Sequence, residues 1–252
     1  MLSGTMGDEP GKYRQSLDEP VAPGTSGLAQ AKEQLREETS PEKRAQEVRL
    51  LISIPIIHSE QDMGSLLSKL KREYVQRYGA EKWAKHVKTV DELWTAIAKA
   101  IESLDLSYGS VLRIYQDGLP ECGREVDIVK EVAAQGSRNY QLLLELVNRG
   151  AKLMGTENPE LLVKEYRLHK EALTAAPREG DVAARQRQEQ SRLLLAERDR
   201  HIAARINSTL LPGEIGLLFL GLAHSVEPLL DPDVLVKKLM PALPGVGEPP
   251  DG

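Results

Sequence analysis

Apolar and polar residues alternate along the chain in blocks that predict strands separated by helices. Between short apolar runs, apolar residues recur at the three-to-four-residue spacing of amphipathic helices. Strands that alternate with helices in this way are typical of a parallel sheet. We therefore predict an α/β fold, a mainly parallel sheet with helices on both faces. The predicted strands are Val48–Ile57, Ser110–Tyr115, Ala151–Met154, Gly216–Leu222 and Val234–Leu239.

Cap residues mark where several helices are expected to begin. Thr89 and Glu92 have the spacing of a capping box, which predicts a helix start at Thr89. Ser137 follows a glycine that can end the preceding helix, and it is a good N-cap for the next one. Asn158, directly before a proline, predicts another helix start. A long polar helix is expected over Val182–Leu210.

Composition divides the chain into one folded region and two ends. Residues 1–45 and 241–252 are poor in large apolar side chains and rich in glycine, proline and charged or small polar residues. Such segments cannot recover their ordering entropy through burial, so we expect both to be disordered. Residues 46–240 contain every predicted element and are expected to form a single α/β domain.

Several classes of protein are disfavoured by composition. Cys122 is the only cysteine, which argues against a disulfide framework and fits a reducing compartment. No apolar stretch is long enough to cross a bilayer, so we expect a soluble, cytoplasmic protein without a membrane partner. A net charge of −5 and an aromatic content of 4% argue against nucleic acid as a partner. No phosphate-binding loop, dinucleotide fingerprint or nucleophile elbow is present. The oligomeric state is left open.

Polar residues that suit catalysis stand just after the predicted strands. His58 follows the first strand, Asp117 the second, Glu157 the third and His224 the most apolar one. Because the carboxyl ends of parallel strands share one edge, where open α/β folds bind ligands, these side chains are expected to converge. Imidazole serves as acid, base or metal ligand near neutral pH. Gly221 is expected to allow a close approach beside His224.

Each of these residues also has a structural interpretation. Ser59 and Asp62 fit a capping box, and Asp117-Gly118 fits a turn. A histidine after a strand is often only a solvated loop residue. The shared-site hypothesis therefore depends on the number of such residues that reach the same edge.

The C-terminal third contains a motif that resembles a known superfamily. Glu197-Arg198-Asp199 is followed by Ile202-Ala-Ala-Arg-Ile206 and then by Leu217-Leu-Phe-Leu-Gly-Leu-Ala-His224. This resembles the acidic-Arg helix and Gly-x-x-His strand of the superfamily that includes TraB/PrgY pheromone-shutdown proteins, Tiki metalloproteases, ChaN-like haem-binding proteins and erythromycin esterases. Arg198 and His224 are the matching positions.

Outside residues 197–224 the resemblance rests on order along the chain. The earlier Gly-x-x-His of the family falls on Pro55-Ile-Ile-His58, where proline replaces glycine. A family glutamate corresponds in order to Glu157. Because members hydrolyse esters or peptides or bind haem, the resemblance leaves the reaction open.

These observations favour a hydrolase-like enzyme, metal-assisted or histidine-based, acting on a small molecule or a peptide. His58, His224 and Glu157 are the candidate metal ligands, and Asp117 and Glu157 are expected to orient a histidine or complete the shell of an ion. Arg198 is expected to bind an anionic group or stabilise developing negative charge. The cofactor is left open: a divalent metal is one possibility and fits better than haem, and a metal-free histidine mechanism is an almost equal alternative. The alternatives are a non-catalytic ligand- or haem-binding protein of the same fold, and an interaction scaffold.

Overall fold

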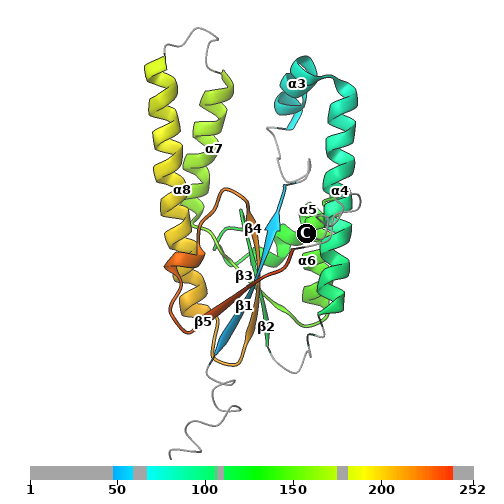
Figure 1. Cartoon of the computed structure of the whole chain (residues 1–252), viewed down its shortest axis with the longest axis vertical. Coiled ribbons are helices and arrows are strands. Elements are labelled where there is room, and N and C mark those ends of the chain that lie inside the picture. The colour runs from blue at the N-terminus through cyan, green and yellow to red at the C-terminus, as the bar shows by residue number, and fades with distance from the viewer. Residues whose placement is uncertain (1–47, 59–66, 105, 107–110, 175–180, 241–252) are drawn as a thin grey trace, which may run out of the picture. The chain divides into compact units, whose positions relative to one another are not determined.

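The computed structural model describes residues 48–58, 67–104, 106, 111–174 and 181–240 (Figure 1). The chain separates into two units, Met1–Lys43 and Arg44–Gly252, and all described elements belong to the second. The predictions of disorder for residues 1–45 and 241–252, and the capping box at Ser59 and Asp62, lie outside the described residues.

Five parallel strands form one sheet in the order β3-β2-β4-β1-β5. The predicted α/β fold with a parallel sheet is therefore confirmed. The most apolar strand lies in the middle, where both of its faces are covered. The strands are β1 (Arg49–Ile56), β2 (Leu112–Gln116), β3 (Lys152–Met154), β4 (Ile215–Gly221) and β5 (Val234–Lys238).

Six α-helices connect and cover these strands in the described part of the chain. Two of the predicted caps are confirmed. The Ser137 side chain accepts a hydrogen bond from the Tyr140 N–H at 3.3 Å, and Asn158 Oδ1 accepts one from the Glu160 N–H at 2.8 Å. The helices are α3 (Leu67–Tyr78), α4 (Ala80–Ser103), α5 (Glu125–Ala134), α6 (Arg138–Asn148), α7 (Pro159–Thr174) and α8 (Asp181–Thr209), with a short 3₁₀ turn, η2 (Glu227–Leu229).

The helix start predicted at Thr89 is wrong. α4 begins at Ala80, directly after Gly79, and continues through Thr89 without a break. The Thr89 hydroxyl donates to the Lys85 carbonyl at 3.0 Å, so the side chain is satisfied inside the helix. Buried Trp83 and Val90 extend the apolar stripe of α4 toward its N-terminus, and this packing outweighs the local capping signal.

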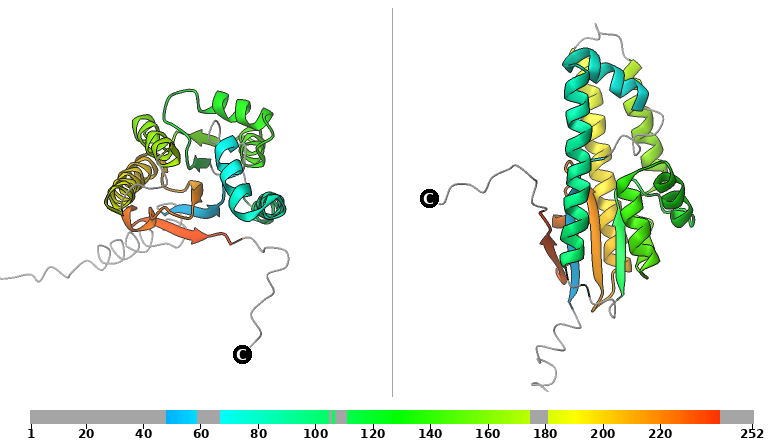
Figure 2. Two further views of the ribbon diagram at one scale, coloured as in Figure 1. Left: turned by 90° about the horizontal axis from the view of Figure 1, so that it is seen from above. Right: turned by 90° about the vertical axis from the view of Figure 1, so that its right-hand side faces the viewer.

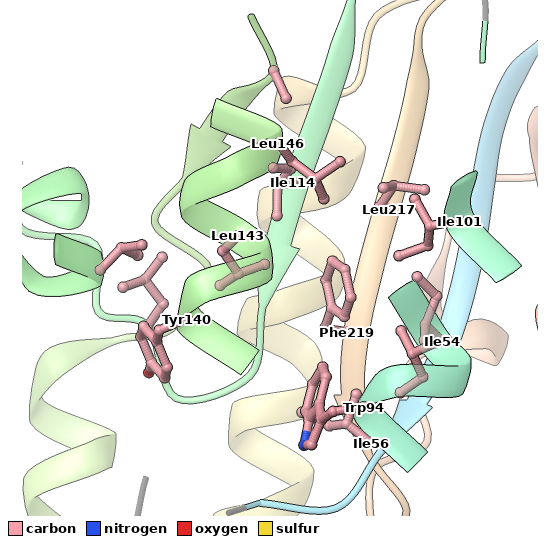
Figure 3. Packing of buried hydrophobic residues seen from close by; sticks show 14 of the residues in the cluster. Ile54, Ile56, Trp94, Ile101, Ile114, Tyr140, Leu143, Leu146, Leu217 and Phe219 are labelled. Carbon is pink, nitrogen blue, oxygen red and sulfur yellow. The ribbon is translucent and has the colours of Figure 1, made fainter. Parts of the chain in front are cut away.

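The two faces of the sheet carry separate apolar cores. On one face, strand residues pack against α4, α5 and α6, and the rings of Trp94 and Phe219 stack with centroids 6.3 Å apart (Figure 3). On the other face, Leu51 and Leu218 pack against Ile202 and other apolar residues of α8. Helices thus cover both faces, as predicted (Figure 2).

Two helix pairs rise from the carboxyl edge of the sheet. α3 packs against α4, and α7 packs against α8. Figure 1 shows both pairs extending past the ends of β1, β2 and β4. None of the described helices combines the length and apolar character that crossing a bilayer requires.

Candidate functional site

Asp117 stands at the end of β2 and is the centre of a buried polar cluster. Its backbone N–H donates to the Phe219 carbonyl at 2.9 Å, which continues the pairing of β2 with β4 by one residue. Gly118 then adopts a φ of 78°, a conformation that favours glycine, and the chain turns sharply. The turn leaves the Asp117 carboxylate inside the protein, 3% exposed.

Glu157 is held beside this turn by backbone pairing. Its N–H donates to the Leu119 carbonyl at 3.0 Å, and its carbonyl accepts from the Glu121 N–H at 2.8 Å. The residue is completely buried. The Glu157 side chain therefore has a fixed position next to Asp117.

Arg198 of α8 neutralises part of the negative charge in this cluster. Its Nη2 atom lies 2.8 Å from Asp117 Oδ1 and 2.5 Å from Glu157 Oε1, and its Nε donates to Glu157 Oε2 at 3.2 Å. Its Nη1 donates to Glu165 Oε1 of α7 at 2.5 Å. The guanidinium thus serves three carboxylates of the protein itself.

His224 is clamped between two carboxylates. Its Nδ1 lies 2.6 Å from Asp199 Oδ1, and its Nε2 lies 3.4 Å from Asp117 Oδ2. The other oxygen of Asp199 accepts the Ser225 N–H at 3.0 Å. The His224 side chain is only 3% exposed, so its position is fixed by these contacts.

His58 reaches the same oxygen of Asp117 from the end of β1. Its Nε2 also lies 3.4 Å from Asp117 Oδ2, and its side chain is 40% exposed. The two imidazole nitrogens are therefore separated by no more than twice that distance. The structure brings His58, Asp117, Glu157 and His224 together, as their positions at strand ends predicted, and Arg198, which the family resemblance suggested, joins them from α8.

The hydrogen-bond pattern indicates a cation or a proton between His224 and Asp117. Because both oxygens of Asp199 act as acceptors, the Nδ1 of His224 carries a proton. In the neutral ring, the Nε2 lone pair would then face the Asp117 carboxylate, which is repulsive. Protonation of His224 or a bound cation removes that repulsion.

The pKa values in the cluster reflect the same competition. Burial lowers the pKa of His224, but the hydrogen bonds and charges of Asp117 and Asp199 outweigh it and leave the pKa raised. Burial raises the pKa of Asp117, but His224 and His58 hold it well below its usual range. Burial raises the pKa of Glu157 more than Arg198 lowers it. We nevertheless assign Glu157 as ionised, because the pKa of Arg198 is raised and its guanidinium bonds both Glu157 oxygens.

Gly221 makes the convergence sterically feasible. A Cβ atom at this position would lie 2.7 Å from Asp117 Oδ2, 3.7 Å from His224 Cδ2 and 3.8 Å from His58 Nε2. Its N–H donates to Asp117 Oδ2 at 3.0 Å. The sequence predicts that backbone or a ligand approaches Gly221 closely, whereas the structure shows a close approach by the Asp117 side chain.

Asp117, Glu157 and His224 form a cluster that could hold a metal ion. Each offers one ligand atom, and these atoms lie within 4.8 Å of one another. Ligand atoms about 2.1 Å from a tetrahedral zinc ion are separated by roughly 3.4 Å. The distances from Asp117 Oδ2 to His224 and to His58 are both 3.4 Å, so the donors fit such an ion.

Asp117 and His224 of this cluster lie at the floor of a pocket of about 700 Å³. His58, Asp117, Arg198 and His224 all line it, together with residues of α3, α4, α7 and α8. A second hollow near Lys88 and Arg138, with a volume of about 560 Å³, contains none of the predicted site residues. The pocket above His224 is therefore the candidate site.

No family model, curated protein or solved structure matches the chain.

Sequence reasoning gave no role to two carboxylates of this site. Asp199 orients His224, and Glu165 binds Arg198. Asp199 directly follows Arg198 in the Glu197-Arg198-Asp199 run, and this position next to a candidate site residue was the sequence feature that could have indicated its role. Glu165 lies in a helix rich in charged residues and has no local signal of its own.

Proposed function

We propose that the chain is a hydrolase-like enzyme that uses a divalent metal ion held by His58, Asp117 and His224, with Glu157 beside them. One observation carries this proposal. Two imidazole nitrogens face the same buried carboxylate oxygen, each at 3.4 Å, on the floor of a pocket. Because Asp199 holds the Nδ1 proton of His224, the Nε2 lone pair of the neutral ring faces this oxygen, and a cation shared by these donors would remove the repulsion.

An ion bound there supplies Lewis acidity and activates water near neutral pH. The protein residues contribute orientation and charge balance. Asp199 retains the Nδ1 proton of His224, so that Nε2 points toward Asp117. Arg198 fixes Asp117 and Glu157 and offsets part of their charge. His58 is the more exposed of the two histidines and lines the pocket.

Hydrolysis, rather than another reaction, is supported by the resemblance of residues 197–224 to a superfamily with hydrolase members. Membership of that superfamily is part of the proposal. Within it, Arg198 and His224 occupy the matching positions, and both lie in the candidate site. Arg198 supports the site through its three carboxylates, which differs from the anion-binding role suggested by sequence.

A metal-free mechanism is the second candidate. The short Asp199–His224 contact of 2.6 Å is the arrangement in which a carboxylate orients a histidine that acts as a general base. In this mechanism His224 Nε2 would take a proton from water in the pocket. Asp117 would then stabilise the imidazolium ring.

Metal analysis and activity assays on the same samples separate these mechanisms. The full-length protein would be purified, treated with chelator and reloaded with zinc, manganese or iron. Bound metal would be measured beside the hydrolysis of ester and peptide-amide panels. His224→Ala and Asp117→Asn test the site. His201→Ala is the matched control, because His201 lies on α8 and is not among the described residues that line the pocket.

We expect one metal ion per chain and hydrolysis that chelator abolishes. The metal ion should be lost in both site variants and retained in His201→Ala. Chelator-insensitive hydrolysis that disappears in His224→Ala would replace the metal mechanism with the histidine mechanism. An absorption spectrum with a Soret band, or ligand binding without turnover, would overturn the hydrolase proposal in favour of a binding protein.

A further inference from the structure

Apolar side chains line the walls of the candidate pocket above its polar floor. On α7, Leu162, Glu165, Tyr166 and His169 all line the pocket, at the spacing of one helical face. Leu195 of α8 and Leu70 of α3 also contribute. Several of the pocket residues are exposed although they are large and apolar: Ile57 is 37% exposed, Tyr166 42% and Leu222 74%.

The pocket is deep because its walls are helices that rise from the sheet. From Leu162 to His169, α7 advances about 10 Å along its axis. Opposite, the Trp94 indole N–H donates to the Ile57 carbonyl at 3.2 Å, close to the end of β1. His86, eight residues earlier on α4, lies about 12 Å along the helix axis from Trp94. An extended chain of single bonds advances about 1.2 Å per bond, so an acyl group of about eight carbons, with eight bonds from its carbonyl oxygen to the end of the chain, spans the roughly 10 Å along α7.

Without a bound metal ion, the floor of the pocket does not suit an anion. Arg198 is the only arginine or lysine among the described residues that line the pocket, and its guanidinium is bonded to Asp117, Glu157 and Glu165. An incoming carboxylate or phosphate would have to displace one of these internal partners and would meet the remaining carboxylates. A neutral group at the floor avoids both costs.

The geometry points to a substrate with an uncharged carbonyl group at the floor and an unbranched apolar arm of about eight carbons between the helix pairs. A peptide arm fits less well, because its backbone needs hydrogen-bond partners along its length. The walls offer Leu70, Leu162, Leu195 and the Tyr166 ring to an apolar arm, and their polar groups are those of His86, Glu165 and His169. The inference rests on the proposed function only in calling this molecule a substrate.

Equilibrium binding to the chelator-treated full-length protein tests the inference without turnover and without a metal ion that would itself attract carboxylates. A neutral polarity-sensitive dye would be competed with n-alkanamides from propanamide to nonanamide, with the matching n-alkanoates, and with an uncharged tripeptide amide of similar length. The alkanamide affinity should rise about fourfold per methylene up to octanamide and then level off. The alkanoates should bind at least tenfold more weakly.

Adjacent residues of α7 provide a matched pair of variants. Leu162→Trp narrows the pocket and should weaken octanamide at least tenfold while sparing propanamide. Val163→Trp adds the same ring at a position that is 48% exposed and is not among the described pocket residues, and it should change neither affinity. If Leu162→Trp fails to fold, Tyr166→Ala provides a second variant of the α7 wall, one helical turn farther along.

The inference would be overturned if alkanamide affinity did not depend on chain length, or if both tryptophan variants weakened octanamide equally. Tighter binding of the alkanoates or of the tripeptide amide than of the alkanamides would also overturn it. These outcomes are separable from the fate of the hydrolase proposal. Metal-dependent hydrolysis combined with alkanamide binding that does not depend on chain length would contradict this inference but not the proposed function. Binding that depends on chain length, without hydrolysis of any ester, would contradict the proposed function but not the inferred pocket for an apolar arm.

Discussion

Gly221 shows how a single missing side chain decides whether the site can form. A Cβ here would come within 2.7 Å of Asp117 Oδ2, and the rigid end of β4 leaves little room for adjustment. We expect Gly221→Ala to displace the Asp117 carboxylate and to lower metal affinity or activity at least tenfold. Because Asp117 also pairs with Arg198, the thermal midpoint should fall as well, so metal affinity is the measurement that decides.

Gly216 is the control for this prediction, since it lies in the same strand but away from the site. A Cβ at Gly216 would meet Leu51 Cδ1 at 2.8 Å and Tyr115 Cε2 at 3.3 Å in the apolar core. Gly216→Ala should therefore cost about 1–3 kcal/mol of stability through overpacking, while leaving metal affinity intact in the folded fraction. Denaturation and metal titration of both variants make the comparison. If Gly216→Ala lowered metal affinity as much as Gly221→Ala, the role of Gly221 in the site would be refuted.

Arg198 is the residue whose loss should most weaken the folded state. The Arg198 side chain is 5% exposed, and the side chains of its partners Asp117 and Glu157 are 4% and 0% exposed. Arg198→Met removes the cation and leaves buried carboxylates unpaired, which should cost about 3–5 kcal/mol. Urea denaturation measures this. Arg205→Met, on the same helix but paired with the more exposed Glu121, should cost clearly less. Equal losses of unfolding free energy in the two variants would show that the Arg198 cluster stabilises the fold no more than the exposed Arg205 pair does.

At the scale of elements, the amino edge of the sheet is secured by an ion pair between β2 and the start of β4. Arg113 Nη2 donates to Glu214 Oε1 at 2.9 Å, and the two side chains are 12% and 10% exposed. Burial raises the pKa of Glu214, but the Arg113 hydrogen bond and the Leu211 N–H outweigh it and leave the pKa lowered.

This pair gives the stability of the sheet a pH dependence of known sign. Because the pKa of Glu214 is lower in the folded chain than its usual value of about 4.3, the stabilisation is complete above that pH. It is lost as pH falls through the folded pKa. Glu214→Gln should therefore be less stable than the parent at pH 7, and the difference should shrink in acid. Glu189→Gln, in an exposed pair on α8, should match the parent at both pH values. A difference that persists undiminished in acid would exclude Glu214 ionisation as its source.

The sequence predicted the elements where packing and local signals agree. β1 and β4 appear as short apolar runs because both faces of each strand are buried, and Ser137 and Asn158 cap helices as their positions suggested. The start of α4 was missed for the opposite reason. Thr89 and Glu92 form a local signal for a helix start, while the burial of Trp83 that extends the helix depends on tertiary packing.

At the scale of the whole molecule, the topology explains why distant residues could be expected to converge. Parallel strands present their carboxyl ends at one edge, so His58, Asp117, Glu157 and His224 follow from strand order alone. The partners Asp199 and Glu165 do not follow from it. Their roles depend on how α7 and α8 lie over the sheet edge, which no local pattern encodes.

Binding of the proposed metal ion should stabilise the folded chain as a whole, because its proposed ligands come from the ends of β1, β2 and β4. An ion that binds only the folded state adds about 2.7 kcal/mol at a free concentration one hundred times its dissociation constant. The thermal midpoint of the chelator-treated protein should therefore rise with added zinc or manganese. Asp117→Asn should remove this rise, because it removes the carboxylate that both histidines face.

The unit Arg44–Gly252 alone should show the same metal-dependent rise as the full chain, since every site residue lies within it. Scanning calorimetry of the full chain, this unit and the Asp117→Asn variant, each with and without metal, makes the comparison directly. A rise of equal size in Asp117→Asn would place the ion elsewhere on the protein. A rise in the full chain that vanishes in Arg44–Gly252 would mean that residues before Arg44 contribute to the site. Either result would contradict a metal centre built only from the ends of the sheet and the helices above it.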